Sequence, residues 1–294
     1  MEVVFALITA LGFGFDYYFI RKGLLTDPYP LIAAFLTLTV NFVFFLLLFS
    51  LYVPRGLMRF DYIFPFIVAG ILAPGLARIL SYRGLGKLGM GISTPIINSE
   101  TLFSVLMAVI FLHERLNVEI GIGIVAVVVG LILLSYETGK GENSGKGKNV
   151  KLIYLLYPFS AAAFYGMSVF FRKYGLTYSH SPILGATVTS GTSWIILLLL
   201  LLFSREIKGL ARIGRNGLAY FMMGGVMTCV AWFSIFSALN IGNISLVAPI
   251  ANSYSLVTLF LSHFFLKKIE IITLRTVLAT VLVVGGVTML ITGR

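Results

Sequence analysis

The sequence predicts an all-α membrane protein in which ten transmembrane helices form two inverted repeats of five. Its composition, its long apolar runs and an internal repeat all predict this fold class. Of the 294 residues, 59% are apolar and 11% are charged, and the mean hydropathy is +0.99. Because a soluble domain is roughly 45–50% apolar and about 25% charged, one soluble core could not hide this much apolar surface.

Each predicted helix is an apolar run long enough to cross a bilayer, which takes about 20 residues. Charged residues or glycine and proline separate one run from the next. In the first half, the runs fall at 3–20, 30–52, 62–82, 89–112 and 119–136. In the second half, they fall at 152–171, 182–203, 217–238, 243–266 and 272–291. The runs do not alternate apolar and polar residues as the strands of a membrane barrel would.

A polar stretch divides the chain. ETGKGENSGKGKNVK at 137–151 is rich in glycine and lysine and cannot span a membrane, so we predict a flexible linker there. The linker separates a first repeat at 1–136 from a second repeat at 152–294.

The two halves repeat one another residue by residue. PIINSETL at 95–102 matches PIANSYSL at 249–256, with tyrosine in the second half where the first half has glutamate. Because each half holds five spans, an odd number, the second half enters the membrane from the opposite side. Inverted repeats of this kind are typical of proteins that work by alternating access.

Several motifs resemble a known family module. SETLFSVLMAVIFLHERL at 99–116, GIVAVVVGLILL at 123–134 and LGFGFDYYFIRKGL at 11–24 are similar to the EamA-type module of the drug/metabolite transporter superfamily. The resemblance covers both halves, although FLKKIE at 265–270 departs from the FLHERL of 111–116. It implies a ten-helix fold and transport of metabolites or drugs, often as export, and it is silent about the substrate.

Glu100 is the strongest candidate for a functional residue. It lies near the middle of the fourth predicted span, where a carboxylate costs at least about 2.5–3.5 kcal/mol and normally faces a cavity or a partner. We expect it to carry a proton or bind a cation, or else to form a static pair with Arg78 or a protonated hydrogen bond.

Arg78 lies in the third span at the repeat position of Trp232, one helical turn before Tyr82. It could hold a substrate carboxylate, or it could neutralise Glu100. If both charges line one cavity, a zwitterion such as an amino acid would fit.

Asp16 lies toward the end of the first span. Three interpretations stay open for it: a solvated position near the membrane edge, a pair with Arg21 or Lys22, or a place in the site.

The remaining candidates are neutral. Asn98 and Asn252 are kept in both halves, as structural contacts would be, although direct contact with a ligand stays open. Tyr254 replaces Glu100 in the second half, as a substrate contact would. The residues expected to line a central cavity are Glu100, Arg78, Tyr82, Tyr254, Trp232, Tyr165, Asn41, Asn98, Asn252 and Asp16.

Other chemistry is excluded or given little weight. No P-loop, GxSxG, HExxH or paired-cysteine motif occurs, so we predict no catalytic residue, no cofactor and no metal. The only cysteine, Cys229, rules out an internal disulfide. We interpret His113, Glu114 and Arg115 as a solvated turn. The net charge of +11 is scattered through short loops, which favours membrane-flanking positions over a nucleic-acid partner.

We therefore expect a secondary active transporter of the cell membrane that moves a small polar metabolite, coupled to protons and acting as an exporter. An exporter or flippase of amphipathic drugs or lipids is the alternative. An intramembrane transferase would need clustered His, Asp or Ser residues, which are absent. The expected partners are a small-molecule substrate and the lipid bilayer. Spans 5 and 10 are expected to pack at the periphery or to mediate dimerisation, and the protein is expected to be a monomer or a homodimer.

Charge and resemblance disagree about orientation. Ten spans place both termini on one side, and the resemblance puts that side in the cytosol. Most loop lysines and arginines fall on the other side, however, and the positive-inside rule favours the reverse. We follow the resemblance.

Overall fold

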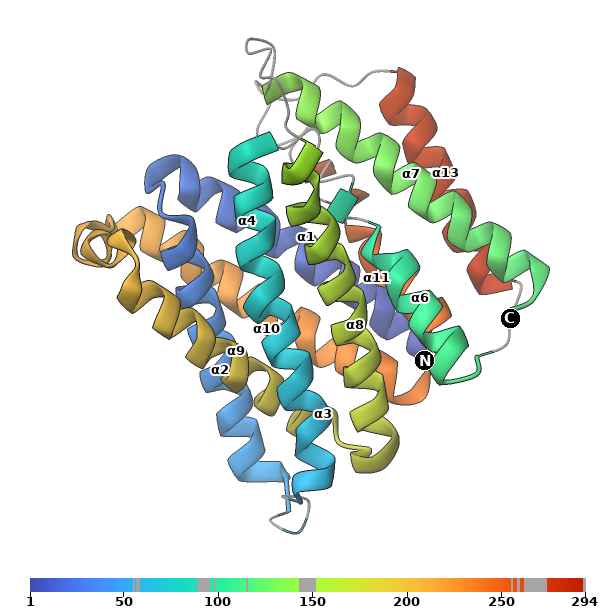
Figure 1. Cartoon of the computed structure of the whole chain (residues 1–294), viewed down its shortest axis with the longest axis horizontal. Coiled ribbons are helices and arrows are strands. Elements are labelled where there is room, and N and C mark those ends of the chain that lie inside the picture. Colours follow the sequence, from blue (N-terminus) through green and yellow to red (C-terminus); the bar gives the residue numbers. More distant parts are fainter. Residues whose placement is uncertain are drawn as a thin grey trace.

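A computed structural model describes residues 1–54, 56, 59–88, 96–97, 99–114, 116–142, 152–254, 256–257, 260–261 and 274–292. In this part of the chain, helices follow one another through short connections (Figure 1). The first half contains α1 (Glu2–Thr26), α2 (Pro30–Tyr52), α3 (Phe60–Gly70), η2 (Ile71–Leu76), α4 (Ala77–Leu88), α6 (Glu100–Phe111) and α7 (Val118–Glu142). The second half contains η3 (Leu152–Leu155), α8 (Leu156–Ser179), α9 (Pro182–Phe203), η4 (Arg205–Arg212), α10 (Arg215–Ile241), α11 (Ile244–Asn252) and α13 (Leu274–Thr292).

The helix lengths confirm the predicted fold class. Within the described residues, six helices are long and apolar enough to cross a membrane, and three shorter apolar helices lie within the predicted spans 4, 5 and 10. The predicted ninth span begins with α11, and the described residues after it include further helical positions. The protein is therefore an all-α, multi-pass membrane protein.

Proline sets two equivalent helix starts. Pro30 begins α2 and Pro182 begins α9, each at the first helical position, where its missing N–H removes no helical hydrogen bond. Ser181 caps the second of these helices, because its side chain accepts a hydrogen bond from the Leu184 N–H at 3.3 Å.

Several helices run past the ends that the sequence predicted. The helix α1 continues from 20 to Thr26, and α4 continues from 82 to Leu88. The helix α8 continues from the predicted end at 171 to Ser179, and His180 closes it in the left-handed conformation with φ 47°. Arg172 and Lys173 follow the predicted end of the sixth span, which put them in the next loop. That prediction was wrong, because both residues lie within α8. The helix α7 continues to Glu142, into the stretch expected to be a linker.

The third span is broken. The chain leaves helical geometry at Ala73, with φ −152° and ψ 134°, just before Pro74. Side chains from the second half satisfy the carbonyls near the break. Ser168 donates to the Ala69 carbonyl at 2.9 Å, and Ser193 donates to the Gly70 carbonyl at 2.9 Å. Irregular backbone is tolerated at membrane depth when neighbouring side chains supply its hydrogen bonds.

The two repeats interlock. The helix α1 packs mainly against α10, while α8 packs against α3, α4 and α6. The helix α2 packs against α9 and α10. Each of these contacts joins helices from opposite halves, so the core forms between the repeats rather than inside each of them. Buried aromatic side chains such as Phe66, Trp232 and Phe236 fill that core.

The helices α7 and α13 form a pair at one side of the molecule (Figure 1) and pack mainly against each other. Gly123 and Gly286 allow the close approach, because a Cβ on either would come within about 3 Å of the other's carbonyl oxygen. These helices are the expected spans 5 and 10. They pack mainly against each other, and inward-facing residues such as Val127 and Val283 join the same buried cluster as Trp232. The start of α1 and the end of α13 lie at the same end of the bundle, which is called the terminus side below.

Candidate functional site

An equivalent serine interrupts the helix in both repeats. Ser99 immediately precedes α6 and Ser253 immediately follows α11, with nearly equal φ and ψ of −69° and −1° against −66° and 0°. Each backbone N–H donates to the carbonyl three residues earlier, Ile96 or Ile250, at 3.2 Å, and each hydroxyl donates to the same carbonyl at 2.6 or 2.7 Å. Glu100 and Tyr254 are thus the first residues after two symmetric turns.

Glu100 and Asn252 meet across the repeats. Glu100 accepts a hydrogen bond from the Asn252 side chain. The Asn252 amide also donates to the Thr101 hydroxyl at 2.7 Å, and Thr101 is fully buried. An amide carries two N–H donors, so one asparagine from the second half holds two neighbouring residues of the first.

Arg172, which the sequence analysis did not nominate, belongs to this cluster. It reaches from α8 and interacts electrostatically with Glu100. Its guanidinium lies over the rings of Trp232, at 4.8 Å, and Phe236, at 5.5 Å. Its Nη2 donates to the Ala73 carbonyl of the broken third span at 3.0 Å. The sequence does carry a signal for this position: Ser181–Pro182 marks the start of α9, and nothing before it breaks the helix that contains Arg172.

Aromatic side chains surround Tyr254. Its ring stacks on Tyr17 of α1 with centroids 5.3 Å apart, and the edge of Phe13 approaches it at 6.0 Å. Tyr165 of α8 interacts electrostatically with Tyr254 and with Arg172. The structure therefore brings the predicted residues Tyr165 and Trp232 to the same neighbourhood as Glu100.

Two glycines at equivalent positions of the repeats, Gly14 of α1 and Gly166 of α8, allow these helices to pack closely against this region. A Cβ on Gly166 would come within 2.9 Å of the Glu100 carbonyl and 2.8 Å of the Ser104 nitrogen. A Cβ on Gly14 would come within 2.5 Å of the Val257 side chain. The same Gly position thus contacts the residues after the serine turn in both repeats.

Asp16 lies neither in a solvated position nor beside Lys22, two of the environments that the sequence left open. It accepts a hydrogen bond from Thr228 of α10 and interacts electrostatically with Arg78. Its Oδ1 is buried, with no hydrogen-bond partner among the described residues. Lys22 instead lies over the rings of Tyr18, at 5.0 Å, and Tyr220, at 5.7 Å. The interpretation of Asp16 as solvated or paired with Lys22 was therefore wrong. Arg78 interacts electrostatically with Asp16. Glu100, for which Arg78 was the predicted partner, interacts with Arg172 instead.

The other predicted residues lie apart or outside the description. Asn41 is completely buried in α2, and neither of its amide atoms has a partner among the described residues. Asn98 lies outside the described residues, and only the backbone of Tyr82 is described. In the described part of the chain, no group of three His, Cys, Asp or Glu side chains could hold a metal ion.

Glu114 makes structural hydrogen bonds, although the sequence predicted a solvated turn there. Its carboxylate accepts hydrogen bonds from the Ile244 N–H at 2.8 Å and from the Ser245 N–H and hydroxyl at 3.0 and 2.7 Å. It therefore caps the start of α11 rather than belonging to a solvated turn. Lys173 donates to carbonyls at the end of α10, those of Leu239 and Gly242, at 2.7 and 2.8 Å. Both contacts fix the turn between α10 and α11.

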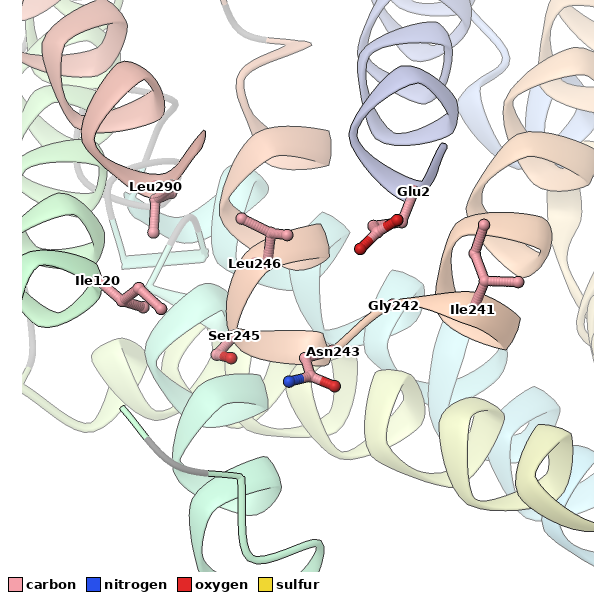
Figure 2. A pocket seen from close by; sticks show the side chains of 8 residues that line it. All are labelled: Glu2, Ile120, Ile241, Gly242, Asn243, Ser245, Leu246 and Leu290. Carbon is pink, nitrogen blue, oxygen red and sulfur yellow. The ribbon is translucent and has the colours of Figure 1, made fainter. Parts of the chain in front are cut away.

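The described residues also enclose a pocket of about 220 Å³ at the terminus side (Figure 2). Glu2 of α1, Ile120 of α7, Leu290 of α13 and the connection between α10 and α11 line it. Its polar side comes from Glu2, Asn243 and Ser245, none of which the sequence analysis nominated. The pocket lies next to the Glu114 cap, since Ser245 belongs to both.

Comparison with known protein families shows to which family the chain belongs. The family model of the EamA-like transporters matches residues 1–136 and 152–292, nearly the whole chain. The chain belongs to the EamA-like transporter family. Members of this family are transporters and not enzymes, so this EamA-like chain is a membrane transporter.

Two further likenesses accompany the EamA-like match. A solved crystal structure superposes with a TM-score of 0.77 over 98% of this chain and 95% of the other, at 16% identity, which shows a shared fold. An uncharacterized protein of Methanocaldococcus jannaschii is 28% identical over 129 residues, covering 44% of this chain and 89% of that protein.

Proposed function

We propose that the protein is a secondary active transporter that moves an amino acid or a related small polar metabolite across the cell membrane by alternating access. One observation carries the proposal: a carboxylate inside the membrane, Glu100, is held by an amide of the opposite repeat where both repeats interrupt a helix. Interrupted helices at the repeat interface are where secondary transporters bind substrate and coupling ions.

Alternating access requires contacts that close one side and can be exchanged for contacts on the other. In the described conformation, Glu114 at the end of α6 holds the start of α11 at the terminus side. We propose that this cap keeps the terminus side closed. When that side opens, α6 and α11 separate and the three hydrogen bonds of Glu114 break.

Proton coupling is part of the proposal. Glu100 touches Asn252 from the other repeat and interacts electrostatically with Arg172. Adding a proton removes its negative charge and weakens both interactions, which links proton binding to the packing between repeats. Export as the direction and a cytosolic position of the termini follow from the family resemblance. The oligomeric state, monomer or homodimer, stays a prediction.

The proposed substrate class is tested by counterflow in proteoliposomes. Vesicles holding purified protein are loaded with an unlabelled standard amino acid, and entry of the same labelled compound is followed for each amino acid in turn. We expect saturable exchange of at least one. If no amino acid exchanges while a lipophilic cation such as ethidium does, the alternative of a drug exporter replaces this proposal.

A further inference from the structure

Arg172 is a buried cation whose surroundings leave one of its donors unused. It is 9% exposed, and its Nε has no hydrogen-bond partner among the described residues. Placing an arginine at membrane depth is unfavourable, and a buried donor without a partner adds to that cost. A residue held in this way needs a reason beyond packing.

The one hydrogen bond that Arg172 makes to another described residue uses a single N–H of its guanidinium. Its Nη2 donates to the Ala73 carbonyl at 3.0 Å, an oxygen that also lies 3.2 Å from the Ser168 hydroxyl. That hydroxyl has a single proton and lies nearer the Ala69 carbonyl, at 2.9 Å. Arg172 therefore supports the broken third span with one N–H, and four more N–H donors of its guanidinium, Nε among them, are left for other partners.

The position of the guanidinium fits ligand binding. The Arg172 Cζ lies 4.8 Å from the Trp232 ring centroid and 5.5 Å from that of Phe236, so the two rings hold the cation in place without using its N–H donors. Guanidinium groups bind carboxylates by parallel N–H donors from one edge. The Nε is the donor that this arrangement leaves without a partner.

Glu100 determines what kind of anion can enter. In the absence of substrate, Arg172 and Glu100 interact with each other. A simple anion would bind Arg172 and leave Glu100 without its counter-charge in a low-dielectric site. A zwitterion gives each of the two groups a partner of opposite charge, its carboxylate on Arg172 and its ammonium on Glu100, without changing the net charge of the site.

We propose that Arg172 binds the carboxylate of a zwitterionic substrate whose ammonium group binds Glu100. This inference rests on the proposed function and deepens it: the substrate must carry both groups, and Arg172, rather than the Arg78 predicted from the sequence, is the carboxylate-binding residue.

The test uses the wild-type protein first, because its outcome does not depend on a variant that folds. Leucine and phenylalanine counterflow is challenged with isopentylamine and phenethylamine, which lack the carboxylate, and with isocaproate and hydrocinnamate, which lack the ammonium. We expect the amino acids to compete and the four analogues to compete roughly 10- to 100-fold more weakly, since a hydrogen bond to a charged group contributes about 1.5–3 kcal/mol.

The second part of the test uses variants of Arg172. Arg172→Gln and Arg172→Lys should each weaken amino-acid competition roughly 10- to 100-fold, because lysine keeps the charge but loses the planar edge. Arg59→Gln is the matched control, since Arg59 is an exposed loop residue beside Asp61.

The outcomes separate the two proposals. Absence of exchange for every standard amino acid overturns the proposed function and this inference together. Exchange in which the amines compete as well as the amino acids, or which survives Arg172→Gln unchanged, overturns the role of Arg172 alone.

Discussion

Asn252 shows how much of this molecule depends on single polar side chains between the repeats. Its amide contacts Glu100 and Thr101, two adjacent residues of the other half. Thr101 is fully buried, so removal of its hydroxyl leaves an Asn252 N–H without that acceptor. Losing one partner therefore affects both the packing of the repeats and the position of Glu100.

Thr101→Val tests this contact with little change in shape. The variant removes the hydroxyl that accepts from Asn252 at 2.7 Å, and we expect it to lower the free energy of unfolding by about 1–3 kcal/mol. Thr177→Val is the control, because Thr177 is exposed and bonds only within its own helix. Denaturant titration in detergent measures both, and equal stability of the two variants would show that the bridge contributes nothing.

Glu114→Ala removes a helix cap. Three hydrogen bonds to the start of α11 are lost, and a missing cap costs about 0.5–2 kcal/mol. We expect a lower thermal midpoint in detergent for this variant than for Glu119→Ala, in which an exposed glutamate is removed from the first turn of α7. A midpoint no lower than that of the control contradicts the capping role.

Sequence patterns could indicate Glu100, Asn252 and Tyr254, because each is polar inside a long apolar run. They missed Arg172, because the apolar run ends just before it and the charge was taken as the end of the span. The partners of Asp16 and Glu114 lie on helices far away in the sequence, α10 and α11, and no local pattern encodes contacts of that kind.

At the scale of helices, proline and apolar length predicted where most of the described spans begin, and α2 and α9 begin at the predicted prolines. They did not predict where α1, α4, α7 and α8 end, each about six to eight residues past its apolar run. The break at Ala73 was not predicted. Its irregular backbone is supported by Ser168, Ser193 and Arg172 from other helices, and proline alone also occurs in helices that only bend. A break of this kind depends on the tertiary partners.

Gly166→Ala tests the close approach of α8 to α6. The added Cβ meets backbone atoms of Glu100 and Ser104 within 3 Å, so the helices must separate, and overpacking of this kind costs about 1–3 kcal/mol. Gly285→Ala is the matched control, because nothing lies within 4 Å of its added Cβ. Alanine there should be neutral or stabilising by up to about 1 kcal/mol. Equal unfolding free energies for the two variants would contradict the observed packing.

At the scale of the whole molecule, the internal repeat predicted two matching five-helix halves of opposite orientation. That their helices interlock is seen only in the structure, where α1 packs against α10 and α8 against α6. Arg172 and Lys173 lie within α8, so the loops of the terminus side carry two fewer cations than the sequence predicted. The positive-inside rule therefore opposes the proposed cytosolic termini more strongly than the sequence alone suggested.

Topology is tested by cysteine labelling in sealed right-side-out vesicles. In a Cys229→Ser background, Arg59→Cys reports the α2–α3 connection and Lys208→Cys reports η4 between α9 and α10. An odd number of predicted spans separates these positions, so an impermeant maleimide should label one and not the other. Labelling of Lys208→Cys alone is expected for cytosolic termini, and labelling of both contradicts the predicted topology.

The central claim is that Glu100 couples proton movement to transport. The most direct measurement is accumulation of the exchanged amino acid in proteoliposomes under an imposed pH gradient, comparing wild type, Glu100→Gln and the control Glu119→Gln. We predict that the wild type and Glu119→Gln accumulate the amino acid against its concentration gradient. Glu100→Gln should lose this accumulation, because its amide cannot bind and release a proton. Accumulation by Glu100→Gln equal to that of the wild type would contradict the claim.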